Sequence, residues 1–303
     1  MGISVTILGS NSALPTSERN PTAQVLNASG RFFLIDCGEG TQMQLRRNRV
    51  HFGKIDHVFI SHLHGDHVFG LPGLISSFGL LGRTKDLHIH GVVDLETVLR
   101  PVIDYFSKEL PFNIVFHRIN PLEKELIYED AVLGVSTFPV EHRIPTVGFL
   151  FREKPKERKI NKPVCDFYNV PLRVLPKLKQ GADFMRDNGE QILNEKLTFP
   201  APPSLSYAFC TDTLPLQSVA EVVKGVDMLY HEATFMSDQE GLAKKTFHST
   251  ARQAAEIALE AGVKKLLIGH FSSRYRDLSP LLAEAREVFP DTEIAGEGVT
   301  FDI

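Results

Sequence analysis

The sequence predicts an α/β fold in which helices cover β-sheets. Three observations support this prediction. Short apolar runs of strand length recur along the chain, helical patterns lie between some of them, and the mixture continues to the end of the chain. A composition of 43% hydrophobic and 23% charged residues over 303 residues is close to the globular average, which excludes a disordered, fibrous or low-complexity chain.

The predicted strands are short apolar runs, several of them β-branched or aromatic and ending at Gly, Asp or His. In chain order they are residues 5–8, 31–35, 57–60, 132–140, 205–209, 227–230 and 265–268.

The clearest predicted helix covers residues 251–261, with Ser249 or Thr250 as its N-cap and Gly262 as its stop. A second helix is expected after the start signal at residues 277–280.

Composition also excludes several classes of protein. No apolar run approaches the roughly 20 residues of a membrane helix, and the first residues lack the basic segment of a signal peptide, so we expect a cytoplasmic protein. The three cysteines are far apart and form no C-x-x-C pair, which argues against a disulfide framework or a thiolate zinc site. A net charge of −4 argues against coating nucleic acid through bulk positive charge.

The strongest local signal is an H-x-H-x-D-H motif directly after the strand predicted at residues 57–60. Its side chains are His62, His64, Asp66 and His67. Three imidazoles and one carboxylate in so tight a loop do not easily bind a single ion, but they can contribute to two adjacent ions about 3.5–4 Å apart.

Three other predicted strands end in residues that commonly bind metals. His142, Asp212 and His270 each follow an apolar run. Each alone is as often a structural residue, but together they supply the imidazoles and the carboxylate that complete a dinuclear site at one edge of a sheet.

With these motifs, the chain resembles the metallo-β-lactamase superfamily and, within it, the ribonuclease Z family over nearly its whole length. The superfamily loop alone leaves lactonase, glyoxalase and nuclease activities open. The segments at residues 231–235 and 248–251 resemble those of the ribonuclease Z family and narrow the choice to it. The full set of matching motifs comprises Ile35-Asp36-Cys37-Gly38-Glu39-Gly40, Phe69-Gly70-Leu71-Pro72-Gly73-Leu74, His231-Glu232-Ala233-Thr234-Phe235, His248-Ser249-Thr250-Ala251 and Gly269-His270-Phe271-Ser272-Ser273-Arg274-Tyr275.

The resemblance implies a four-layer αββα fold in one domain over residues 1–303, with an inserted, protruding basic arm at 152–180 that binds tRNA. It implies a zinc-dependent endoribonuclease that removes 3′ trailers from precursor tRNA. A hydroxide held by two metal ions attacks, leaving a 3′-hydroxyl on the tRNA and a 5′-phosphate on the trailer. It further implies a homodimer whose arm contacts tRNA bound at the other subunit.

The resemblance also assigns the metal ligands. His62, His64 and His142 resemble ligands of one zinc ion, Asp66, His67 and His270 resemble ligands of the other, and Asp212 resembles the bridging carboxylate. Asp66 also takes a proton from the attacking water in this family. Two zinc ions, two carboxylates and a hydroxide leave a charge of about +1, which suits an anionic phosphodiester. The nitrogen and oxygen donors also accept Mn or Fe.

Four further residues receive roles from the same resemblance. His248 resembles the proton donor to the leaving ribose oxygen, and Glu232 resembles its carboxylate partner. Arg274 resembles a residue near the phosphate, where a guanidinium fits a bidentate contact. Asp36 resembles a residue that supports the metal loop.

Five histidines match no motif and are expected at the surface or in packing roles: His51, His57, His88, His90 and His117. His231, which precedes Glu232 at a strand end, is expected to be structural.

The basic segment changes how the net charge is interpreted. Residues 152–179 contain nine basic and three acidic residues, a net +6, so the rest of the chain carries −10. This polarity predicts salt-sensitive tRNA binding that depends on the arm. Three positions depart from the family pattern: Asn169 and Thr211 replace glycines, and Ser17 replaces a lysine.

Two other functions are compatible with the sequence. One is a small-substrate phosphodiesterase on the same fold, which would need no basic arm. The other is a catalytically silent RNA-binding protein, against which the complete ligand set and the Glu232 and His248 pair argue.

Overall fold

The computed structural model describes residues 2–107 and 109–303. Contacts divide the chain into two compact units. The first unit comprises Met1–Arg152 and Leu205–Ile303, and the second comprises Glu153–Ser204.

The first unit contains two seven-stranded sheets. In the first sheet, β1, β2 and β3 pair antiparallel, whereas β3, β4, β5 and β6 pair parallel. Its spatial order is β18 (Thr300–Asp302), β1 (Ile3–Gly9), β2 (Ala23–Ala28), β3 (Arg31–Ile35), β4 (Ile55–Phe59), β5 (Leu87–Val92) and β6 (Ile114–Ile119).

The second sheet has a parallel half formed by β14 to β17, and β9 pairs antiparallel with β14. Its spatial order is β17 (Thr292–Ile294), β16 (Lys265–Gly269), β15 (Met228–Glu232), β14 (Ser206–Cys210), β9 (Val147–Glu153), β8 (Leu133–Pro139) and β7 (Leu126–Glu129). All seven strands predicted from sequence are present, with ends that differ from the prediction by at most two residues.

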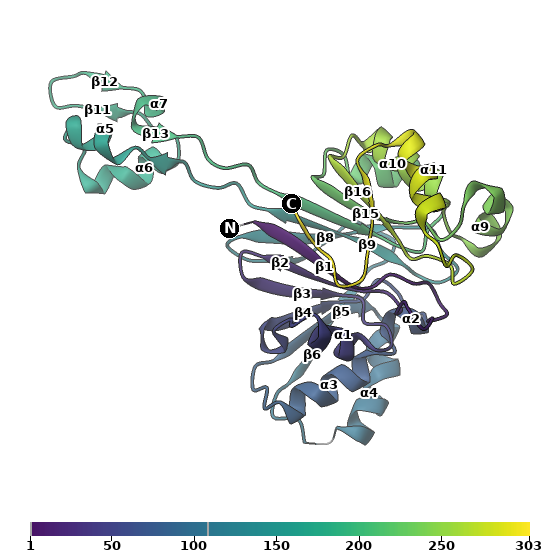
Figure 1. Cartoon of the computed structure of the whole chain (residues 1–303). Coiled ribbons are helices and arrows are strands. Elements are labelled where there is room, and N and C mark those ends of the chain that lie inside the picture. The colour runs from purple at the N-terminus through teal and green to yellow at the C-terminus, as the bar shows by residue number, and fades with distance from the viewer. Residues whose placement is uncertain (1, 108) are drawn as a thin grey trace. The chain divides into compact units, whose positions relative to one another are not determined.

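The helices of the first unit lie on the outer faces of the two sheets (Figure 1). One group consists of α1 (Thr41–Arg47), α3 (Leu71–Leu80) and α4 (Asp94–Phe106), and the other of α8 (Gln217–Val222), α10 (Ala251–Ala261) and α11 (Ser279–Val288). The remaining pieces are α2 (Gly65–Val68), α9 (Glu240–Thr246) and the 3₁₀ turns Phe52–Lys54 and Ser237–Gln239.

Three hydrophobic clusters hold these layers together. On β3, the side chains of Phe33 and Ile35 enter the cluster between the sheets, while Leu34 enters the cluster under the helices. Strands buried on both faces read as continuous apolar runs, which is why they are visible in the sequence. The helix–sheet–sheet–helix order confirms the predicted four-layer αββα fold.

Helix α10 confirms the predicted bounds 251–261 and decides its N-cap. Thr250 accepts from the backbone amide of Gln253, whose side chain accepts in turn from the Thr250 amide. Gly262 ends the helix in a left-handed conformation with φ 60°. This capping fixes the loop just ahead of the helix.

The second unit has a small core of its own, formed by Cys165, Leu178, Ile192 and Leu197. The predicted basic segment 152–180 lies mostly within it. The unit contains β10 (Lys159–Ile160), α5 (Lys162–Phe167), the 3₁₀ turn Leu172–Val174, α6 (Leu175–Lys179), β11 (Phe184–Met185), β12 (Gln191–Ile192), α7 (Asn194–Leu197) and β13 (Thr198–Phe199).

Asn169 follows α5 with φ 53°, in the left-handed region. Asparagine tolerates this region better than most residues, so it can replace the glycine usual in the family without changing the turn. No helix within the described residues combines the length and apolar character of a membrane span.

Four histidines that match no motif form a ladder on β4, β5 and β6, apart from the strand ends. His57 Nδ1 lies 3.1 Å from His90 Nε2, and His88 Nδ1 lies 2.9 Å from His117 Nε2. Burial, followed by the neighbouring imidazoles, lowers the pKa of His57 to about 4 and that of His90 to about 2. His57 and His90 therefore stay neutral in the folded protein at neutral pH.

This ladder predicts a loss of stability in mild acid. Because the folded-state pKa of His90 lies below the unfolded value of 6.5, its contribution is complete above pH 6.5 and declines as the pH falls towards 2. Replacing His90 by Phe should reduce the loss in unfolding free energy between pH 7.5 and 5 by about 2 kcal/mol. Urea unfolding measures this difference, with exposed His51→Gln as control; an unchanged pH dependence in His90→Phe contradicts the prediction.

Candidate metal centre and active site

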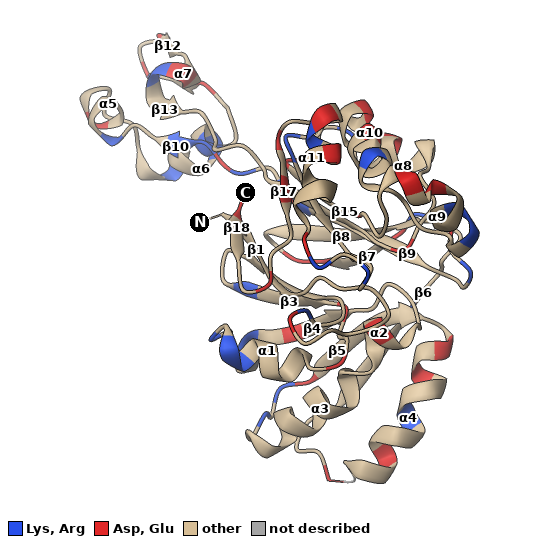
Figure 2. Ribbon diagram, turned by 45° about the vertical axis from the view of Figure 1, so that its right-hand side comes forward, with Lys and Arg blue, Asp and Glu red and all other residues tan. Residues whose placement is uncertain are grey.

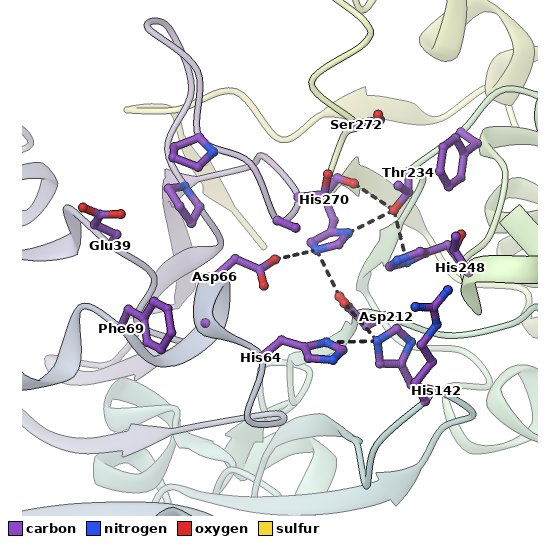
Figure 3. A pocket seen from close by; sticks show the side chains of 18 residues that line it. Glu39, His64, Asp66, Phe69, His142, Asp212, Thr234, His248, His270 and Ser272 are labelled. Atoms are coloured by element: carbon purple, nitrogen blue, oxygen red, sulfur yellow. Dashed lines mark hydrogen bonds and ion pairs between the residues drawn. The ribbon is translucent and has the colours of Figure 1, made fainter. Parts of the chain in front are cut away.

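The polar residues of the site follow the ends of strands from both sheets. Those that line one pocket include His64, Asp66, His142, Asp212, His248 and His270 (Figure 3). Asp36 follows β3, Asp212 follows β14, Glu232 ends β15 and His270 follows β16. The H-x-H-x-D-H residues follow β4 and His142 follows β8. Carboxyl ends of parallel strands meet at one edge of a sheet, so distant segments contribute to one site.

The first group of candidate ligands is His62, His64, His142 and Asp212, whose donor atoms lie within 4.8 Å of one another. His64 Nδ1 lies 3.0 Å from His62 Nε2 and 3.2 Å from His142 Nε2. The donors of a tetrahedral ion with bonds of 2.0–2.2 Å are about 3.4 Å apart, so this spacing fits one divalent ion.

The second group is Asp66, His67 and His270. Asp66 Oδ2 lies 3.2 Å from His67 Nε2 and 3.4 Å from His270 Nε2. This triangle of two imidazoles and one carboxylate matches the second predicted ligand set.

Asp212 lies between the groups, and its two oxygens face different ones. Oδ2 lies 3.5 Å from His62 Nε2 and 3.6 Å from His142 Nε2, whereas Oδ1 lies 3.4 Å from His67 Nε2 and 3.1 Å from His270 Nε2. The carboxylate therefore has the orientation of a bridge between two ions.

The hydrogen bonds around His67 test whether these residues fit a metal. Asp36 Oδ2 accepts from His67 Nδ1 at 2.7 Å, and its oxygens also accept from the amide and hydroxyl of Ser61 at 2.8 Å. His67 Nε2 is buried and lacks a hydrogen-bond partner among the described residues. A histidine oriented by a carboxylate, with its other nitrogen unpartnered among ligand-type atoms, is the arrangement of a metal ligand.

Three of the site's strand-end residues adopt left-handed backbone conformations. The φ angles are 54° at Asp36, 47° at Asp212 and 56° at His270. Non-glycine residues rarely adopt such angles, and those that do cluster at functional sites. The backbone therefore turns sharply at each of these residues, directly after the strand.

Thr211, which replaces the glycine usual in the family, orients the neighbouring Asp212. Its hydroxyl donates to Asp212 Oδ1 at 2.8 Å. Burial would raise the pKa of Asp212, but the imidazoles of His270 and His67 outweigh it and hold that pKa well below its usual range. The Asp212 carboxylate is therefore ionised and oriented.

The predicted pair His248 and Glu232 is present beside these groups. His248 Nδ1 donates to Glu232 Oε1 at 2.8 Å, and Glu232 is fully buried. The same carboxylate accepts from the amides of Thr213 and Thr234 and from the Thr234 hydroxyl, at 3.0, 3.1 and 2.6 Å. Burial lowers the pKa of His248, but Glu232 outweighs it and raises that pKa to about 9.

The groups open into a pocket of about 600 Å³. Arg143, next to His142, lines it and was not predicted from the sequence. Arg274 is exposed outside the pocket lining, with its guanidinium 5.7 Å above the ring of Phe235, which does line the pocket.

One wall of the pocket includes Ser12, Ala13 and Pro15, and Glu297 bonds to residues on both sides of this loop. Glu297 accepts from the amides of Ser10 and Asn20 at 3.2 and 2.6 Å and from the side chains of Asn20 and Gln44 at 2.7 and 2.9 Å. No sequence pattern indicates this role of Glu297, because its partners are up to 287 residues away.

Comparisons with known proteins identify the family of the chain. Residues 3–155 match the family model described as "Anti-Pycsar protein Apyc1", which places the N-terminal half in that group. The chain is 50% identical to ribonuclease Z of Parabacteroides distasonis over 299 residues, covering 99% of this chain and 98% of the relative. The chain belongs to the ribonuclease Z family. Ribonuclease Z of Bacteroides thetaiotaomicron is 51% identical over 98% of this chain and 94% of that protein.

Solved structures of similar proteins have the same fold. The crystal structure of human tRNase Z, short form, has a TM-score of 0.72 at 25% identity and covers 98% of both chains. The metallo-β-lactamase fold protein YhfI of Bacillus subtilis has a TM-score of 0.71 at 18% identity over 100% of both chains.

These matches confirm the family and fold predicted from the sequence. They also support an endoribonuclease, and the His and Asp groups described above are of the kind that hold a divalent metal.

Proposed function

We propose that this enzyme removes 3′ trailers from precursor tRNA by hydrolysis at two zinc ions per subunit. The tRNA keeps a 3′-hydroxyl and the trailer a 5′-phosphate. The observation that carries the proposal is Asp212, whose oxygens face two separate ligand groups beside the Glu232–His248 pair.

His62, His64 and His142 would hold one ion, Asp66, His67 and His270 the other, and Asp212 both. When bound, the two ions would supply water of lowered pKa and positive charge against the phosphate. Asp66 is a weak base while it is a ligand, so its contribution in the proposal is to orient the attacking water.

His248 supplies the proton that the leaving ribose oxygen needs. Its Nδ1 is engaged by Glu232, so Nε2 is the nitrogen that can deliver a proton. Because Glu232 raises the pKa of His248 to about 9, the imidazole carries that proton at neutral pH. Arg143 in the lining and Arg274 above Phe235 are the cations we propose to contact the phosphate.

The test of this proposal is cleavage of a precursor tRNA with a defined trailer, followed by mapping of both product ends and of the metal content of the same preparation. We expect one cut at the tRNA 3′ end, a 5′-phosphorylated trailer and two zinc ions per subunit. Hydrolysis of a small phosphodiester without cleavage of precursor tRNA would replace the proposal with the phosphodiesterase alternative.

The second unit is proposed to bind the body of the tRNA. Lys and Arg residues occur on β10 and α6 of this unit (Figure 2). Lys159, Arg173 and Lys177 are exposed, and no carboxylate within the described residues pairs with them. Lys162, by contrast, pairs with Asp166. Unpaired cations are free to contact phosphates.

Changing Lys159, Arg173 and Lys177 to Glu should weaken tRNA binding about 10- to 100-fold and make its salt dependence less steep by about two to three units in log–log slope. Filter binding at several salt concentrations measures both. The control reverses three exposed cations of the first unit, Arg49, Lys124 and Lys224. Equal binding by both triple variants would contradict the assignment.

A homodimer and a cytoplasmic location complete the proposal. The family resemblance supports the dimer, with the second unit contacting tRNA at the other subunit; sedimentation of the enzyme tests it. Cys37, Cys165 and Cys210 are buried and free, which fits a reducing compartment.

A further inference from the structure

One wall of the pocket carries no ligand and no proton donor, yet two of its side chains are open to solvent. Phe69 lines the pocket with 72% of its surface exposed, and Glu39 is exposed beside it (Figure 3). Figure 3 shows both on the side of Asp66 away from His142 and His248. The catalytic roles described above use neither residue.

The ring of Phe69 is held against the metal loop. A Cβ atom on Gly65 would lie 2.3 Å from a carbon of that ring, so the ring covers the backbone at Gly65, between His64 and Asp66. The aromatic surface therefore lies next to the loop that carries two candidate metal ligands. The other aromatic ring in the lining, Phe235, is only 5% exposed.

Glu39 makes this wall unsuitable for a phosphate. Arg143 is the one Lys or Arg among the described lining residues, and it follows His142 on the opposite wall. Within the described part of the chain no hydrogen-bond donor or cation pairs with the Glu39 carboxylate. An ionised acceptor beside a bare aromatic face suits a planar group that carries N–H donors.

We infer that Phe69 and Glu39 form a nucleobase subsite next to the scissile phosphate. The base of a flanking nucleotide stacks on Phe69 while its amino group donates to Glu39. Stacking of unpaired bases on aromatic side chains is the usual way in which proteins hold single-stranded RNA. The inference rests on the proposed function, because it needs RNA in the pocket.

The experiment measures KM and kcat of the metal-loaded enzyme on precursor tRNA, using Phe69→Ala, Phe69→Leu and Phe69→Tyr. We expect a rise in KM of about tenfold for Ala and Leu and near-complete recovery for Tyr, because only Tyr restores an aromatic face. Phe106→Ala on α4, where the ring is 75% exposed outside the pocket, is the matched control. Leucine performing as well as phenylalanine overturns stacking.

A second arm replaces one nucleotide on either side of the cleavage site by an abasic nucleotide. At one of these positions the wild-type enzyme should lose about tenfold in kcat/KM, and Phe69→Ala should lose nothing more, as expected for partners in one contact. If the losses in kcat/KM from Phe69→Ala and from the abasic nucleotide multiply at both positions, the ring and the base are not partners, and the subsite is overturned. Cleavage by the wild-type enzyme reports separately on the proposed function, and the metal content of each variant reports on the integrity of the loop.

The Glu39 contact is tested by placing each of the four bases at that position. Adenine, cytosine and guanine carry amino groups and uracil does not, so the wild-type enzyme should cleave the uracil substrate about fivefold less efficiently. Glu39→Ala should remove this difference. Equal cleavage of all four substrates by the wild-type enzyme overturns the role of Glu39.

Discussion

Replacing His248 by Ala should lower kcat for precursor tRNA by about 10²- to 10⁴-fold while both metal ions stay bound. The leaving group is a ribose oxygen that must be protonated as the bond breaks, and His248 is the imidazole held by the buried Glu232 at 2.8 Å. Single-turnover cleavage measures the rate and elemental analysis measures the metal content.

The leaving group offers a control for this prediction. A p-nitrophenyl phosphodiester releases a phenolate that needs no proton, so His248→Ala should retain most of its activity on that substrate. Glu232→Gln should lose less activity on precursor tRNA than His248→Ala does and should also retain most of its activity on the p-nitrophenyl substrate. The reason is that the amide keeps an oxygen acceptor for His248 but loses the charge. Full activity of His248→Ala on precursor tRNA, or loss of metal, would refute the assignment.

Replacing Asp212 by Ala should abolish metal-dependent cleavage, with a loss of at least about 10³-fold, and reduce the bound metal to less than one ion per subunit. The carboxylate faces four imidazole nitrogens, two from each group. Without the Asp212 carboxylate, Asp66 is the one anionic side chain left in the ligand set to balance the charge of two divalent ions. Elemental analysis and precursor cleavage measure the two effects.

The adjacent hydroxyl supplies the matched control. Thr211→Gly removes the hydrogen bond to Asp212 Oδ1 and keeps the ligand, so both ions should remain and cleavage should fall by less than about tenfold. An Asp212→Ala variant that binds two ions per subunit would show that Asp212 is not the bridge.

Much of the fold could be predicted because its central strands are buried on both faces. The run at residues 31–35 coincides with β3, and residues 265–268 lie within β16. Strand β5 escaped detection because His88 and His90 interrupt its apolar run. The core of the second unit escaped because residues as distant as Cys165 and Leu197 build it without periodicity.

The sequence by itself determined the chemistry of the site. Metal binding and proton transfer depend on the side-chain types, and the ligand-type residues follow strands that are locally recognisable. The tertiary structure decided their geometry, because long-range contacts aim each group: Asp36 fixes the tautomer of His67, and a left-handed turn directs Asp212 between two ligand groups. The tertiary structure was also needed to find the pocket wall formed by Phe69 and Glu39, since the packing of distant segments determines which side chains remain open to a substrate.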